Sequence, residues 1–165
     1  MVKRRLTEYS GQLMMFLCVI LLFLRFFWVA AIIYILWYAL YGFVGLSFFF
    51  STARKIALSN LLLRVTLYPT LLPFRKSFYF WTKSVNVILK NPADTETAYS
   101  LAKKVNVDAL CTDNNKAFFL SYLASLYNDL GDKENAYNCI KEAQGIPHKK
   151  AIKELINRVY DEIAD

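Results

Sequence analysis

The chain has 165 residues, a hydrophobic fraction of 56% and a formal net charge of +7, which together leave room for one apolar region and one small water-compatible domain. The charge is unevenly placed, because residues 52–90 carry +7 without any acidic side chain while residues 91–165 sum to −3. The basic residues therefore adjoin the apolar part of the chain. This pattern argues against nucleic-acid binding and favours contact with anionic lipid headgroups.

The apolar region covers residues 13–50 and contains one charged side chain, Arg25. As a single helix these 38 residues would extend roughly 57 Å, about twice the thickness of a bilayer's hydrocarbon core. The length therefore predicts a transmembrane helical hairpin within residues 1–51, with passes at about 9–24 and 29–50. A half-inserted first helix followed by a single span over 26–50 is the alternative that the sequence leaves open.

Basic and aromatic residues flank the predicted spans, in the arrangement typical of membrane–water interfaces. The positive flanks on both sides predict that both termini are cytoplasmic and that the chain is an integral protein of the bacterial inner membrane. The apolar run is too long for a cleaved signal peptide, so we expect it to be retained. The predicted interface residues are Lys3, Arg4, Arg5, Arg25, Trp28, Arg54, Lys55 and Arg64.

Residues 52–77 form a basic, apolar stretch that is interrupted by Pro69 and Pro73. The apolar positions between Ile56 and Leu72 do not keep to one helical face, so a clean amphipathic helix is not expected there. The interpretation is a connector that lies along the membrane and packs partly on the domain that follows.

From residue 78 to the end, the pattern is typical of an all-α domain of short antiparallel helices. Asp94, Asp113 and Asp132 are predicted N-caps, and Gly131 is predicted to end the helix before it. A 3–4 spaced apolar stripe on the last helix predicts that it covers another helix; its members are Ile152, Leu155, Ile156, Val159 and Ile163. The expected helices are 74–90, 94–105, 113–130, 132–145 and 147–164.

Comparison of the chain with itself shows an internal repeat. The hexapeptide Asp-Thr-Glu-Thr-Ala-Tyr that begins at Asp94 matches Asp-Lys-Glu-Asn-Ala-Tyr, which begins at Asp132, at an offset of 38 residues. A period of this size with a helix pair in each unit indicates a helical repeat architecture.

The second unit carries large and small residues in a characteristic order. Gly131 stands at its turn, and the other positions are Leu120, Leu123, Ala124, Tyr127, Ala136, Ile140 and Ala143. This order resembles the tetratricopeptide repeat, although Pro147 stands one place before the usual proline position, at His148. The first unit matches in its second helix, and the resemblance places Trp81 and Val85 in its first helix. The resemblance covers residues 78–147 and implies that the final helix is a cap. A helical hairpin pair with a chance similarity is the alternative.

The resemblance implies a concave face that is lined by the first helix of each unit and binds a peptide of a partner protein. Carried over by position, this face would contain Phe118, Ser121, Ser125, Asn128 and Asp129. These side chains are mostly small and polar, so a basic clamp for a terminal carboxylate is not expected. A solvated helix face without a ligand is the alternative for the same residues.

The sequence holds no recognisable catalytic or metal-binding constellation, and no phosphate-cradling glycine loop. Its one histidine, His148, follows Pro147 without a ligand partner at suitable spacing, and is expected to be an exposed cap residue. Cys18, Cys111 and Cys139 are expected to be reduced thiols. We therefore expect no enzyme activity, no cofactor and no small-molecule substrate. A membrane enzyme would have only Arg25 as a candidate residue.

Two functions fit these expectations. The first is a membrane-anchored adaptor or scaffold, which recruits or assembles a protein partner at the cytoplasmic face of the membrane through its repeat domain. The second is an accessory subunit of a transport, secretion or envelope-synthesis complex, held mainly by its spans through Ala39, Gly42 and Gly45.

Overall fold

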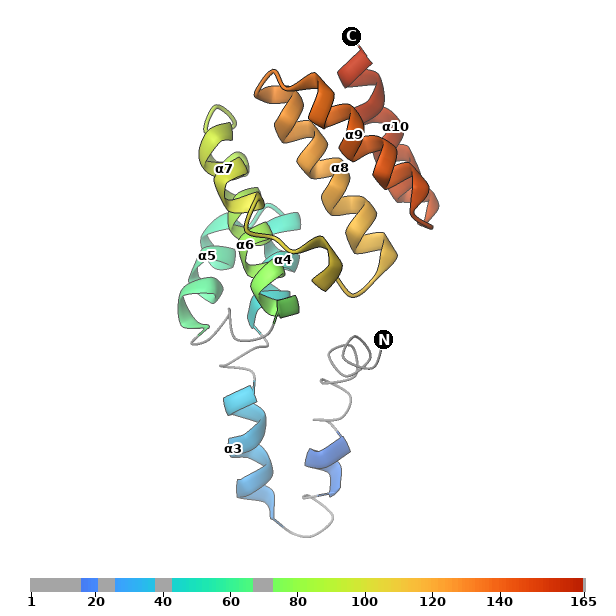
Figure 1. Ribbon diagram of the computed structural model, residues 1–165. Helices are drawn as coiled ribbons and strands as arrows, with labels where there is room; N and C mark the ends of the chain where they lie inside the picture. The colour runs from blue at the N-terminus through green and yellow to red at the C-terminus, as the bar shows by residue number, and fades with distance from the viewer. Residues whose placement is uncertain (1–15, 21–25, 38–42, 67–72, 165) are drawn as a thin grey trace. The chain divides into compact units, whose positions relative to one another are not determined.

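A computed structural model describes residues 16–20, 26–37, 43–66 and 73–164. Every regular element in these ranges is helical and no strand occurs among them, which confirms the predicted all-α class. The chain divides into two compact units, Met1–Tyr79 and Phe80–Asp165. Figure 1 labels the helices in chain order.

The first unit contains α3 (Phe27–Trp37), α4 (Phe43–Thr52) and α5 (Ile56–Val65), and the helix α6 (Pro73–Lys90) begins in it. The helices α4 and α5 pack against each other as a hairpin. The basic connector predicted for residues 52–77 thus includes a helix of ten residues.

None of the helices within the described ranges has both the length and the apolar character required to cross a bilayer. This finding contradicts the prediction of an integral protein of the bacterial inner membrane with both termini cytoplasmic. Residues of the predicted second span form two helices of 11 and 10 residues, α3 and α4. Each is roughly 16 Å long, about half of the hydrocarbon core. Most of the predicted first span lies outside the described residues.

The physical reason for the correction is visible in α4, whose apolar sequence serves a helix hairpin. Val44, Ser47 and Ser51 are fully buried on it. The hydroxyl of Ser47 donates to the Ser59 carbonyl of α5 at 2.9 Å, and the two serine hydroxyls are also 2.9 Å apart. At the start of α6, the ring of Phe78 meets that of Phe48 edge to face, with centroids 5.2 Å apart. High apolar content therefore accompanies specific protein packing here.

The second unit contains the remainder of α6 and four further α-helices, separated by short loops. The last helix begins at Lys150, three residues after the predicted start at Pro147. The helix predicted for 94–105 ends at Ala102, and a short 3₁₀ helix follows it. The elements are α7 (Thr95–Ala102), η2 (Val107–Ala109), α8 (Asp113–Asp129), α9 (Lys133–Gly145) and α10 (Lys150–Ala164).

The caps of these helices agree with the sequence in part. Asp132 caps α9 as predicted, because its carboxylate accepts from the Asn135 N–H at 3.2 Å. The cap of α8 is Thr112 and not Asp113, since the threonine hydroxyl accepts from the Asn115 N–H at 3.1 Å. Asp94 stands at the cap position of α7 without a side-chain capping bond.

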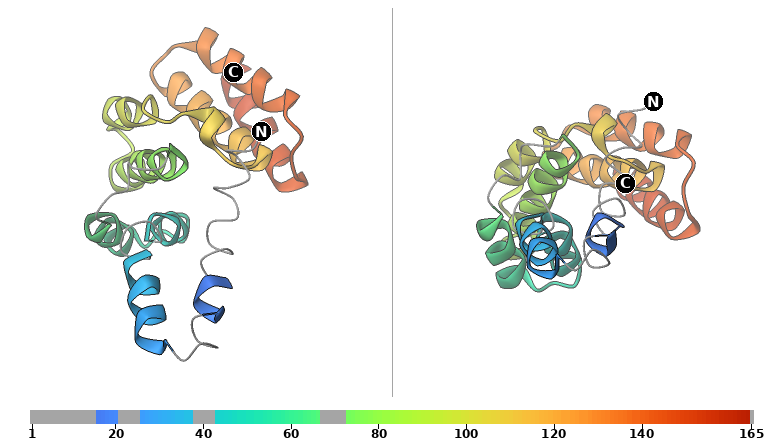
Figure 2. Two further views of the ribbon diagram at one scale, coloured as in Figure 1. Left: turned by 60° about the horizontal axis from the view of Figure 1, so that its bottom comes forward. Right: turned by 90° about the horizontal axis from the view of Figure 1, so that it is seen from below.

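The helices α8, α9 and α10 pack on one another and enclose one hydrophobic core cluster of the second unit. Both views of Figure 2 show these three helices side by side. The predicted stripe on α10 is confirmed, because Ile156, Val159 and Ile163 are buried while Ile152 and Leu155 pack at the edge of the core. The core residues are Ala117, Leu120, Ala124, Ala136, Ile140, Ala143, Ile156, Val159 and Ile163.

Candidate interaction surface

Small residues mark the place where α8 and α9 approach each other. Ala124 on α8 and Ala136 on α9 are 12 positions apart in sequence, and both are 0% exposed. Ile140 and Ala143 follow on α9 and are also fully buried. The absence of long side chains at these positions allows the two helix backbones to approach closely, so α8 and α9 form one packed pair.

A chain of hydrogen bonds joins α6, α7 and α8. The Ser84 hydroxyl donates to the Ala98 carbonyl at 2.6 Å and lies 2.7 Å from the Tyr122 hydroxyl. Because a serine has one proton and the carbonyl takes it, the tyrosine donates to Ser84. Ser84 and Tyr122 are 38 residues apart, so equivalent positions of the two sequence repeats are in contact. Burial raises the pKa of Tyr122 from 10.0 to about 12.

Trp81 anchors the contact between α6 and α8 with its indole ring. The tryptophan is 1% exposed and makes edge-to-face contacts with Phe118 and Phe119, with ring centroids 5.3 Å apart in both cases. Such aromatic pairs contribute about 0.5–1.5 kcal/mol beyond the area they bury. The tryptophan thus holds the N-terminal half of α8 against α6.

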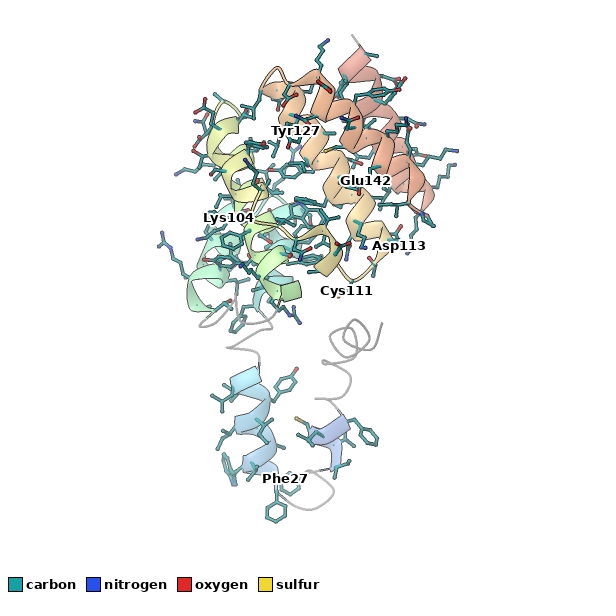
Figure 3. All side chains as sticks on the ribbon, in the orientation of Figure 1. Phe27, Lys104, Cys111, Asp113, Tyr127 and Glu142 are labelled. Carbon is teal, nitrogen blue, oxygen red and sulfur yellow. The ribbon has the colours of Figure 1, made fainter. Side chains whose placement is uncertain are left out.

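Two tyrosine pairs, one sequence repeat apart, join α7 to α8 and α9 to α10. The ring of Tyr99 on α7 meets that of Tyr127 on α8 edge to face, with centroids 5.1 Å apart and a 3.2 Å hydrogen bond from the Tyr99 hydroxyl to the Tyr127 hydroxyl; Figure 3 labels Tyr127. One repeat further on, the ring of Tyr137 on α9 contacts that of Tyr160 on α10 in a tilted arrangement, with centroids 6.0 Å apart. The second helix of each pair therefore presents an equivalent tyrosine to the helix that follows it.

The hairpin α4–α5 of the first unit has the same internal spacing as α8–α9. Ser47 and Ser59 are 12 positions apart and 0% exposed, as Ala124 and Ala136 are. The helix α4 ends at Thr52 and α8 ends at Asp129, a difference of 77 residues. The starts of α5 and α9, Ile56 and Lys133, differ by the same 77 residues.

The three helix pairs α4–α5, α6–α7 and α8–α9 bury equivalent residues on their second helices or just after them. At the first position the residues are Ser59, Ala98 and Ala136, all 0% exposed, with offsets of 39 and 38 residues. The residues four positions and seven positions after each of these three are also buried. These two sets are Leu63, Ala102 and Ile140, followed by Thr66, Val105 and Ala143.

Sequence reasoning missed this first hairpin because its chemistry differs while its spacing is preserved. Serine replaces alanine at both crossing positions, and Arg54 stands where the other hairpin has Gly131. The surrounding apolar residues also favoured a membrane span over a repeat. The sequence signal for this hairpin is two small residues 12 positions apart with an apolar residue four positions after the second, a pattern that other residues of the same apolar region share.

The five residues predicted for the concave face have different environments. Ser121 is fully buried and donates to the Ala117 carbonyl at 2.8 Å, so its hydroxyl does not face a partner. The Asn128 amide donates to the Glu162 carbonyl of α10 at 3.4 Å. Phe118 and Ser125 are half-buried, and Asp129 is exposed. Partial burial raises the pKa of Asp129 above its usual value.

The predicted membrane-interface residues are described in part. Trp28 on α3 is 84% exposed, and Arg54, Lys55 and Arg64 are also exposed. Lys3, Arg4, Arg5 and Arg25 lie outside the described residues, as do Ala39 and Gly42 of the small-residue series. Gly45 lies on α4 in contact distance of Arg75, whose nearest guanidinium nitrogen would lie 3.3 Å from an added Cβ.

The polar and sulfur-containing groups of the second unit have structural surroundings. Burial raises the pKa of the Cys139 thiol to about 11, and the Glu142 and Asp132 charges add to the shift. The resulting low thiolate fraction disfavours nucleophilic chemistry at neutral pH. His148 is half-buried, with its Nδ1 2.5 Å from the Ile146 carbonyl oxygen. Among the described residues, no three potential metal ligands gather into a group.

Comparisons of the chain with protein-family models, with curated protein sequences and with solved structures give no match.

Proposed function

We propose that this protein is an interaction module built from tetratricopeptide-like helix hairpins, which binds a protein partner and performs no catalysis. The hairpins are α4–α5, α6–α7 and α8–α9, and α10 acts as the cap that covers the last of them. Repeats of this kind bury their apolar faces against neighbouring helices and present the opposite faces for binding.

The observation that carries the proposal is the recurrence of buried small residues at one place in all three hairpins. Ser59, Ala98 and Ala136 are each 0% exposed. A chance similarity between two helix pairs would not require a third pair to bury equivalent residues at offsets of 39 and 38. The repeated tyrosine contacts onto α8 and α10 support the same architecture.

The proposed binding face of α8 is reduced to Phe118, Ser125 and Asp129, because Ser121 is buried and the Asn128 amide already donates to the Glu162 carbonyl. Ser125 and Asp129 are four residues apart and therefore lie on one side of the helix. The face combines an aromatic edge, a hydroxyl and a carboxylate. It suits a peptide segment that offers hydrogen-bond donors or a basic side chain, and it has no basic group for a terminal carboxylate.

The test is an affinity capture from native cells with the full chain, followed by crosslinking and mass spectrometry. The double substitution Ser125→Arg and Asp129→Arg places bulk and positive charge on the proposed face. We expect it to abolish capture of the specific partner, while thermal unfolding stays close to that of the unchanged protein. The matched control is Gln144→Arg on the exposed side of α9, which should leave capture unchanged.

Two outcomes would contradict the proposal. If crosslinking recovers the unchanged protein alone and monomeric, there is no partner to bind. If a partner is captured equally by the double variant and by the control, binding takes place elsewhere and the α8 face has no role.

A further inference from the structure

The helix α3 exposes almost all of its side chains although it has no charged residue. Trp28 is 84% exposed, Ile35 65% and Ile32 57%, whereas Ala30 is 3% exposed. Figure 3 shows Phe27 projecting away from the N-terminal end of this helix. A continuous run of exposed apolar side chains marks a site of interaction with another molecule or with lipid.

The helical residues 16–20 add to the same apolar surface. Phe16 is 66% exposed and Val19 46%. The Cys18 thiol contacts the Ala30 carbonyl oxygen at 3.8 Å, which joins this short segment to α3. The described part of 16–37 thus presents two adjoining apolar helical pieces, and no other described helix covers their exposed side chains.

The length of α3 decides how such a surface can meet a bilayer. Its 11 residues extend roughly 16 Å, which matches one leaflet of a hydrocarbon core about 30 Å thick. An apolar segment of this length is typical of an interfacial or re-entrant piece, and not of a span. Attachment to one leaflet is therefore compatible with the absence of a membrane-crossing helix among the described residues.

Charge decides between a lipid surface and a second copy of the chain. The residues of the same unit that follow α3, 38–79, carry +5 and no acidic side chain. A second copy would bring the same positive charge to the interface and be repelled, whereas anionic headgroups would be attracted. Arg54, Lys55 and Arg64 are exposed, and each such residue near an anionic surface contributes about a fivefold gain in affinity.

We propose that α3 and the helical residues 16–20 insert into one leaflet of an anionic bilayer, and that Arg54, Lys55 and Arg64 bind the lipid headgroups. This attachment is peripheral and does not cross the membrane. The attachment involves a different part of the chain from the α8 face, so its test does not depend on the proposed function.

The test is co-sedimentation of the full chain with vesicles of phosphatidylcholine alone and with vesicles that also contain phosphatidylglycerol. We expect strong binding to the anionic vesicles, weak binding to the neutral ones, and a loss of affinity as salt rises. Trp28 emission should shift to the blue on binding and should be quenched by lipids brominated on their acyl chains. The variant Trp28→Phe should remove this part of the signal.

Matched substitutions separate the apolar and the charged contributions. Ile32→Glu or Ile35→Glu should weaken vesicle binding roughly 10- to 100-fold, with helicity unchanged in circular dichroism. The control is Leu130→Glu, which alters an exposed apolar residue of the second unit. Replacement of Lys55 and Arg64 by serine should cost roughly 30-fold at low salt. The same change at the exposed Lys149 and Lys150 should cost little.

Three results would overturn the proposal. Equal binding to neutral and anionic vesicles would remove the role of the basic residues. A dimer that Ile32→Glu converts to a monomer, with vesicle binding unchanged, would identify a second copy as the occupant of α3. Quenching of Trp28 by a reagent confined to the far side of sealed vesicles would show that the chain crosses the bilayer.

Discussion

Gly131 and Arg54 occupy the same place in two helix hairpins, and both have left-handed backbones. Gly131 has φ +79° and Arg54 φ +58°. In each hairpin the following residue donates a hydrogen bond from its N–H to a carbonyl five positions earlier, from Asp132 to Tyr127 and from Lys55 to Phe50. This is the Schellman pattern of a helix end, in which glycine is the usual residue at the left-handed position.

The first prediction concerns the backbone at Gly131. An added Cβ would meet no atom within 4 Å, so the substitution Gly131→Ala tests conformation without a steric clash. We expect the free energy of unfolding to fall by about 1 kcal/mol, because a residue with a side chain is strained at positive φ. Urea unfolding measures the change. An unaltered midpoint would show that the turn is not held in this conformation.

The second prediction concerns Arg54, where the strain is already present. Arg54→Gly should raise the free energy of unfolding by about 1 kcal/mol because it relieves the left-handed conformation. If the arginine binds headgroups, the same variant should bind anionic vesicles about fivefold more weakly. Opposite changes in stability and in binding would identify a residue retained at a structural cost. If Arg54→Gly and the unchanged protein bind anionic vesicles equally well, Arg54 does not contact the lipid.

The third prediction concerns the hydroxyl of Tyr122, whose pKa is raised from 10.0 to about 12 by burial. The folded state holds this proton more tightly than the unfolded state does. Its contribution to stability is therefore complete below pH 10 and is lost as the pH rises toward 12. Tyr122→Phe should lower stability by about 1 kcal/mol at neutral pH.

The same variant should flatten the loss of stability between pH 10 and 12 in denaturant unfolding. Gln144→Ala is the control, because this side chain does not titrate and lies on the exposed side of α9. It should leave the alkaline slope as it is. If both variants give the slope of the unchanged protein, the Tyr122 hydroxyl is not buried as the structure places it.

Among the elements, α10 shows what local sequence patterns can predict. The 3–4 spacing of its apolar residues predicted the face that packs on α8 and α9, and Ile156 is 1% exposed at its centre. Ile156→Ala should lower the free energy of unfolding by about 2–5 kcal/mol, since the substitution leaves a cavity in the core. Lys153→Ala on the exposed side should change it by less than about 0.5 kcal/mol. Thermal unfolding distinguishes the two variants.

The caps and turns of the second unit could be predicted because their signals are local. Asp132 accepts from an N–H three residues away, and Gly131 needs only its own backbone freedom. The assignment of Asp113 as a cap failed because Thr112 has the same capability one position earlier. Adjacent hydroxyl and carboxylate residues compete for one role, and the choice depends on where the helix begins.

The helix α4 could not be predicted in the same way, because hydropathy does not distinguish lipid from a protein core. Ser47 and Ser51 in this helix are fully buried, yet in an apolar run they read as tolerated polar residues of a span. Ser47 is buried because it forms hydrogen bonds with Ser59, which lies on a different helix. Contacts between helices are tertiary information, so the α4–α5 hairpin appears only in the structure.

At the scale of the whole molecule, the repeat period links regions whose compositions differ. The first hairpin is apolar and basic, and the third is polar and mildly acidic, yet both bury a small residue at one equivalent position. Composition alone therefore makes the first and third hairpins look unrelated, whereas the spacing of their buried residues is the same. The candidate face of α8 could be derived by position, but the burial of Ser121 depends on packing that no spacing reveals.

The last prediction tests this equivalence in all three hairpins. Ser59→Leu, Ala98→Leu and Ala136→Leu each insert a large side chain where two helices meet, at positions that are 0% exposed. Each should lower the free energy of unfolding by about 1–3 kcal/mol, because a packed core cannot accept the added volume without strain. Chemical denaturation of the three variants gives the values.

Leucine two residues further along each second helix provides the matched control. That position is Leu61 in the first hairpin and is already leucine, 55% exposed. Ser100→Leu and Asn138→Leu place the same side chain at the equivalent exposed positions of the other two, where we expect changes of less than about 0.5 kcal/mol. If Ser59→Leu is as harmless as these controls while Ala98→Leu and Ala136→Leu are not, α4–α5 is an unrelated hairpin. A loss at all three positions would mean that one packing rule governs the helix pairs from residue 43 to residue 143.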